Sequence, residues 1–80
     1  MLTAYIDAAM HKARYEILPE NASYYGEILE CNGVFANADT LEACRDQLNE
    51  VLEDWIFLRI SKGLSLPVIE GLELSIREVA

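Results

Sequence analysis

Three acidic residues in the middle of the chain have a spacing that could bind a metal ion. Asp39, Glu42 and Asp46 are close in sequence, and carboxylates are the usual ligands of Mg²⁺ and Ca²⁺ in metal-assisted hydrolysis. Acidic residues at the start of a helix also complement the positive end of its dipole, without any ligand. Because these carboxylates come at such a start, we favour dipole complementation and a solvated helix face over a metal site.

A cysteine nucleophile would need a neighbouring base, and His11 is the only histidine of the chain. Cys44 falls on an apolar helical stripe, where a buried structural cysteine is the default. Cys31 lies beside a turn and could be exposed. His11 comes near the end of a helix, where capping is more common than a pH switch or a general base. We therefore expect no catalytic residue, metal or cofactor, and no enzymatic activity.

The charge balance narrows the class of partner. The chain has 14 acidic and six basic residues, a net charge of −8, and its cations form no run. Binding to nucleic acid requires a basic patch that displaces counterions, so no direct nucleic-acid binding is expected. A basic protein would be favoured through faster encounter. The alternative is that the acidity only keeps a small protein in solution.

Eighty residues, 52% of them apolar, indicate one domain over residues 1–80. A core of this size gives little stability, so we expect a homodimer or a higher homo-oligomer. No run approaches the roughly 18 apolar residues of a membrane span. No signal peptide is visible, and the two cysteines do not form a disulfide framework. We expect a cytoplasmic protein that does not bind membranes.

The hydrophobic periodicity predicts an α+β fold with the order α-βββ-α-β. A short helix over about 2–11, with Thr3 as its N-cap, precedes a core of sheet and helix over about 13–76. Alternating or β-branched residues predict strands over 13–18, 24–28 and 34–36, and a fourth over 72–76. Gly26 inside the second strand indicates a bulge or a close backbone approach.

The clearest element is a long helix that begins near Leu41. Thr40 is a suitable N-cap, and Gly63 indicates the end of the helix. Its apolar residues form one stripe at helical spacing, which we expect to pack on an antiparallel sheet. The stripe consists of Leu41, Cys44, Leu48, Val51, Leu52, Trp55 and Leu58. Trp55 is expected to be a core residue, with an interface role as the alternative.

Three segments in this order resemble the HicB-like antitoxin family over roughly residues 13–76. They are Tyr25-Gly26-Glu27-Ile28, Gly33-Val34-Phe35-Ala36, and Asp39-Thr40-Leu41-Glu42-Ala43, which opens the long helix. That helix continues through Leu48-Asn49-Glu50-Val51-Leu52-Glu53-Asp54-Trp55 to Lys62-Gly63 and Pro67. Two departures are Asn32-Gly33, where the family often has Pro-Gly, and Ala43-Cys44, where Glu-Ala is common.

The resemblance implies a partial ribonuclease H-like fold without the nuclease's active site. It also implies binding to, and neutralisation of, a small basic toxin that cleaves messenger RNA. An orphan interaction or regulatory module of the same fold, without a toxin partner, is the alternative. Many members carry a C-terminal DNA-binding domain, whereas this sequence ends at Ala80, so direct DNA binding is not expected. The candidate partner-binding residues are Tyr24, Tyr25, Glu42, Asp46, Glu50, Glu53 and Asp54.

Overall fold

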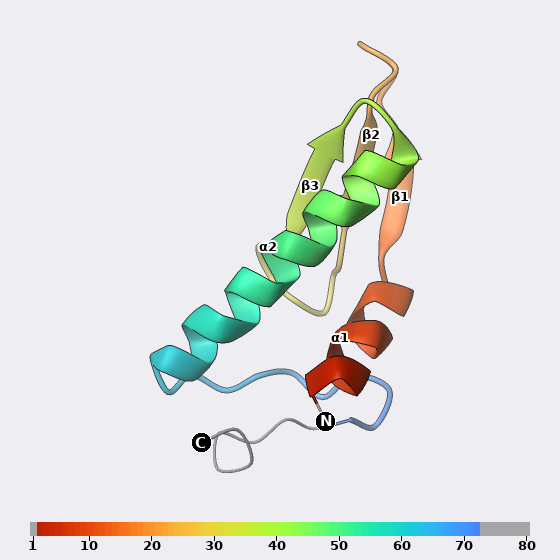
Figure 1. The fold of residues 1–80 in the computed structure, drawn as a ribbon. Coiled ribbons are helices and arrows are strands. Elements are labelled where there is room, and N and C mark those ends of the chain that lie inside the picture. The colour runs from red at the N-terminus through yellow and green to blue at the C-terminus, as the bar shows by residue number, and fades with distance from the viewer. Residues whose placement is uncertain (1, 73–80) are drawn as a thin grey trace.

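The computed structural model describes residues 2–72 and has the element order α1-β1-β2-β3-α2 (Figure 1). The elements are α1 (Leu2–His11), β1 (Arg14–Ile17), β2 (Tyr24–Glu27), β3 (Phe35–Ala38) and α2 (Leu41–Ser61). The α+β class and the order of these five elements are confirmed. The predicted fourth strand over 72–76 falls almost wholly outside the described residues. Within them, Leu72 makes only an isolated antiparallel bridge to Ile69.

The three strands form an antiparallel meander in the order β1-β2-β3. Tyr15 of β1 pairs with Gly26 of β2, which pairs with Ala36 of β3. The register is continuous, so Gly26 marks a close approach and not a bulge. A Cβ atom at Gly26 would lie 2.8 Å from the Tyr15 ring and 3.2 Å from Cys44 Sγ. The third strand begins one residue later than predicted and extends to Ala38.

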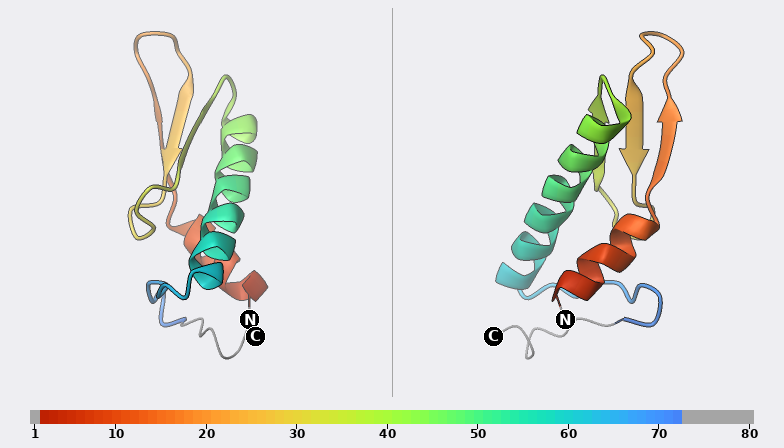
Figure 2. Two further views of the ribbon diagram at one scale, coloured as in Figure 1. Left: turned by 90° about the vertical axis from the view of Figure 1, so that its left-hand side faces the viewer. Right: turned by 45° about the vertical axis from the view of Figure 1, so that its right-hand side comes forward.

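Helix α2 packs across β2 and β3 on one face of the sheet, while α1 lies against the lower half of α2 (Figure 2). Thr40 is the N-cap of α2, since its Oγ1 accepts a hydrogen bond of 3.0 Å from the Ala43 backbone N–H. Gly63 follows the helix with φ of +69°. Both predicted helix boundaries are therefore confirmed. Thr3, in contrast, lies inside α1, which begins at Leu2, so the N-cap prediction for it was wrong.

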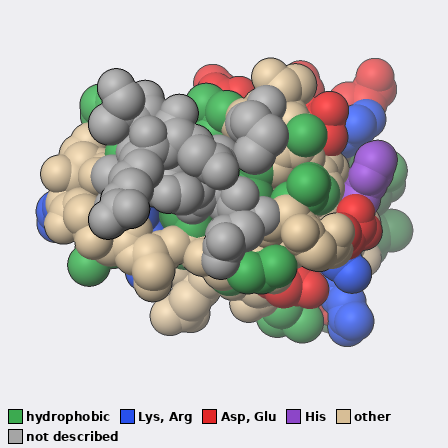
Figure 3. Space-filling view, turned by 90° about the horizontal axis from the view of Figure 1, so that it is seen from below, with side chains coloured by type: hydrophobic (Ala, Val, Ile, Leu, Met, Phe, Trp, Pro, Cys, Tyr) green, Lys and Arg blue, Asp and Glu red, His purple; other side chains and the backbone are tan. Residues whose placement is uncertain are grey.

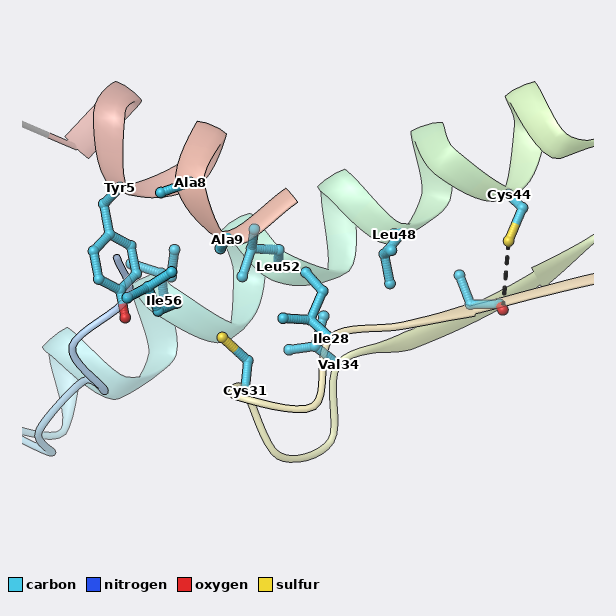
Figure 4. Packing of buried hydrophobic residues seen from close by; sticks show 12 residues of the cluster. Tyr5, Ala8, Ala9, Ile28, Cys31, Val34, Cys44, Leu48, Leu52 and Ile56 are labelled. Carbon is cyan, nitrogen blue, oxygen red and sulfur yellow. Dashed lines mark hydrogen bonds between the residues drawn. The ribbon is translucent and has the colours of Figure 1, made fainter. Parts of the chain in front are cut away.

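The core lies between α2, the inner face of the sheet and α1 (Figure 4). From α2 it takes Cys44, Leu48, Leu52 and Ile56. Two members of the predicted stripe are exposed, Leu41 by 46% and Leu58 by 52%. Leu41 opens the helix, and Leu58 belongs to the lower part of α2 that extends past the strands (Figure 1).

Candidate partner-binding surface

The five predicted acidic residues all lie exposed on α2. Their positions recur at helical spacing, so they form one ridge on the outer side of the helix, opposite the buried stripe. One of these residues, Glu53, accepts a hydrogen bond of 2.9 Å at Oε2 from the Nδ2 group of the neighbouring Asn49. We call this surface the acidic ridge; it consists of Glu42, Asp46, Glu50, Glu53 and Asp54.

An exposed aromatic side chain adjoins the acidic ridge. Phe57 is 72% exposed, more than any other large hydrophobic residue of the described chain. It follows Glu53 and Asp54 by four and three residues, so it is their neighbour on the helix surface. Phe57 was not predicted as a binding residue from the sequence, because a single aromatic residue off the apolar stripe gives no periodic signal. This side of α2 therefore combines negative charge with an exposed aromatic side chain.

The outer face of the sheet carries a second aromatic group. The rings of Tyr25 and Phe35 stack with centroids 6.3 Å apart, and Phe35 is 57% exposed. Tyr25 Oη donates to Glu27 Oε1 at 3.2 Å. Loss of solvation, then the hydrogen bond to Glu27 and its charge, raise the pKa of Tyr25. Tyr24 lies on the opposite, inner face and packs against the core. Of the two predicted tyrosines, Tyr25 therefore offers the more accessible ring.

A shallow groove of about 620 Å³ separates α1 from the first half of α2. Acidic and basic side chains line it together, including Asp7, His11, Arg45 and Asp46. Seen from below, charges of both signs gather around the histidine at one edge of the molecule (Figure 3). Within residues 2–72, no three His, Cys, Asp or Glu side chains come close enough to hold a metal ion. Among the described residues, the groove therefore contains no set of side chains that could bind a metal ion.

Both cysteines are buried and free, so the expectation that Cys31 could be exposed was wrong. Cys31 is fully enclosed by the core, and this burial, followed by the charge of Glu30, raises its pKa to about 11. Cys44 Sγ lies 3.6 Å from the Ala36 carbonyl oxygen, to which it donates (Figure 4). Burial raises the pKa of Cys44 as well. Neither thiol is accessible as a nucleophile, because thiolate formation is disfavoured at both positions.

Comparison with known proteins decides the family. A family model described as UPF0150-like matches residues 4–67, which run from the first turn of α1 to the loop after α2. The chain belongs to the UPF0150-like family. The crystal structure of TTHA0281 from Thermus thermophilus is similar, with 37% sequence identity and a TM-score of 0.85. The match covers 92% of this chain and 91% of TTHA0281. No curated protein sequence matches the chain.

Trp55 has a structural role in this UPF0150-like chain. Its Nε1–H donates a hydrogen bond of 3.0 Å to the Asn32 carbonyl oxygen in the turn between β2 and β3. The Arg59 guanidinium carbon lies 5.0 Å from the centre of the indole ring, within the range of a cation–π contact. Trp55 is half-buried and packs against the core. It therefore connects α2 to the β2–β3 turn, as expected of a core residue.

Within residues 2–72, no helix has the length and apolarity needed to cross a membrane.

Proposed function

We propose that this UPF0150-like chain is a HicB-like antitoxin module that binds and neutralises a small basic toxin that cleaves messenger RNA. The observation that carries the proposal is the acidic ridge with Phe57 beside it. A ridge of carboxylates speeds the approach of a basic partner, and an exposed aromatic residue supplies contact area once the partner has docked. The order of the family-like segments, from Tyr25 to Pro67, supports the antitoxin assignment.

Binding by occlusion requires no catalytic group on the antitoxin, and we propose that the chain is not an enzyme. The two thiols are buried and protonated at neutral pH, and the carboxylates of the acidic ridge are exposed. Both observations agree with a role in binding. The toxin would lose activity because its RNA-binding surface is covered.

Co-expression with the small basic reading frame adjacent to the gene tests the proposal. A stable complex should co-purify, and growth arrest caused by that reading frame alone should be relieved. The association rate of the encoded basic protein with this chain should fall as the salt concentration is raised, because screening weakens electrostatic steering. Absence of such a reading frame, or separate elution of the two proteins at low salt, would contradict the antitoxin role. The remaining hypothesis would then be an orphan interaction module.

Matched variants test the surface. Phe57→Ser should weaken the complex at least about tenfold, as expected for an aromatic residue that anchors an interface. Leu64→Ser is the control, since Leu64 is exposed by 44% but lies in the loop after α2. Replacing Glu53 and Asp54 with lysine should slow association, whereas the same change at Glu20 and Glu30 should have a smaller effect. Equal effects of variant and control would exclude the acidic ridge as the binding surface.

A further inference from the structure

Within the described part of the chain, strand β1 forms one edge of the sheet. Its four residues are all exposed, and within residues 2–72 its only strand partner is β2. Helix α2 packs on β2 and β3, so two apolar side chains on the inner face of β1 remain accessible. Tyr15 is exposed by 36% and Ile17 by 59%. Unpaired edge strands of this kind are templates for pairing with another chain.

The hydrogen-bond pattern shows which residues of β1 face its free edge. The Leu18 N–H donates to the Ser23 carbonyl oxygen at 2.8 Å, at the end of the β1–β2 pair. In an antiparallel pair, every second residue directs both backbone groups to the same neighbour. Leu18, Glu16 and Arg14 therefore bond toward β2. Tyr15 and Ile17 direct their N–H and C=O groups outward, where another strand could receive them.

Among pairings centred on Arg14, Tyr15 or Glu16, the charges of β1 favour one. In a two-fold antiparallel pair, residues directly opposite each other share a face of the sheet. A register centred on Tyr15 places Arg14 of each copy opposite Glu16 of the other. Shifting the centre to Glu16 would place two glutamates opposite each other, and shifting it to Arg14 would oppose two arginines. Like charges in directly opposite positions destabilise a strand pair.

We propose that two copies of this chain associate through β1, antiparallel and in register about Tyr15. Tyr15 N–H groups then donate to Tyr15 carbonyl groups across the two-fold axis, and each Ile17 N–H donates to the Ala13 carbonyl group of the second copy. The Ala13 N–H is already satisfied by the Met10 carbonyl oxygen at 3.1 Å. The two sheets become one continuous sheet, with both α2 helices on the same face.

Charge reversal at β1 tests this arrangement by sedimentation equilibrium at constant salt. The wild-type chain should dimerise below about 1 mM. Arg14→Glu and Glu16→Arg should each weaken the dimer about tenfold, because each creates two like-charge oppositions. The double variant Arg14→Glu/Glu16→Arg should recover the wild-type affinity. Glu20→Arg is the matched control, since Glu20 is exposed in the β1–β2 turn; it should leave the affinity unchanged.

Mixing the two single variants separates the interface from any effect on folding. A copy with Arg14→Glu carries glutamate at both positions, and a copy with Glu16→Arg carries arginine at both. An equimolar mixture should therefore form heterodimers with complementary charges, although neither variant forms a strong homodimer. A monomeric wild type would overturn the proposal. Single variants that dimerise normally, or a mixture that does not, would overturn it as well.

Discussion

At the scale of single residues, the core contains groups that titrate only at alkaline pH. Tyr5 and Cys31 are both buried. Loss of solvation, then the charge of Cys31, raises the pKa of Tyr5 to about 12. The pKa of Cys31 is about 11, with burial as its main cause. Because the charged forms are disfavoured only in the folded protein, these two residues couple stability to pH.

The free energy of unfolding should be insensitive to these two groups up to about pH 9 and should fall above it. Between pH 9 and 11 the unfolded chain releases the Cys31 proton, whose ordinary pKa is 9.0, while the folded chain retains it. The contribution of Tyr5 to the free energy of unfolding is lost next, as the pH rises from the ordinary tyrosine pKa of 10.0 toward about 12. The midpoint of urea unfolding, measured from pH 7 to 11, should decrease over this range.

Cys31→Ala is the informative variant for this prediction. It removes the first titration, so its midpoint should decline less between pH 9 and 10 than that of the wild type, even though the variant is less stable at pH 7. Parallel curves for the two proteins would show that the Cys31 thiol does not titrate differently in the folded state.

At the scale of elements, α2 depends on a single side chain for its start. Thr40 is an exposed N-cap whose hydroxyl satisfies the Ala43 N–H. Thr40→Ala should lower the free energy of unfolding by about 1 kcal/mol, the usual cost of losing a threonine cap. Chemical denaturation measures the change.

Thr3→Ala is the matched control for the cap. The substitution is chemically identical, but Thr3 is an exposed residue within α1, where alanine has the higher helix propensity. It should be neutral or slightly stabilising. A loss of stability equal to that of Thr40→Ala would mean that the Thr40 cap contributes nothing specific.

The helices and strands also show which structural features can be predicted from the sequence and which cannot. Hydrophobic period and cap chemistry located α2 to within one residue, because both signals are local. Exposure at Leu41 and Leu58 was not predictable, since it depends on how α2 is placed against the sheet and α1. The same applies to Cys31, whose turn folds back under α1 and α2. For the candidate surface, helical spacing grouped the acidic ridge correctly, but Phe57 had no periodic signal, and the stacking of Tyr25 on Phe35 required the strand register.

At the scale of the whole molecule, one hydrogen bond connects the first helix to the loop after α2. Tyr5 Oη donates to the Pro67 carbonyl oxygen at 2.5 Å, across 62 residues of sequence. The same loop places Ile69 in the core, and Ile69 and Leu72 exchange backbone hydrogen bonds of 3.0 and 2.8 Å. The position of the loop therefore depends on α1.

Tyr5→Phe should loosen this loop while leaving the sheet intact. The variant removes one hydroxyl group and leaves the Pro67 carbonyl without its partner, at a cost of roughly 1 kcal/mol. Amide hydrogen exchange should become faster at Ile69 and Leu72, with little change at Gly26 and Ala36 in the sheet. Uniform acceleration at all four amides would indicate global destabilisation and not a local connection.

The connection between Tyr5 and Pro67 also determines when α1 can take its final place. During synthesis Tyr5 leaves the ribosome early, but its hydrogen-bond acceptor is added 62 residues later. At roughly 5–20 residues per second, the interval is about 3–12 seconds. The β1–β2–β3 meander needs only local contacts and can pair during that time. The first helix to be made is thus expected to be among the last parts of the molecule to dock.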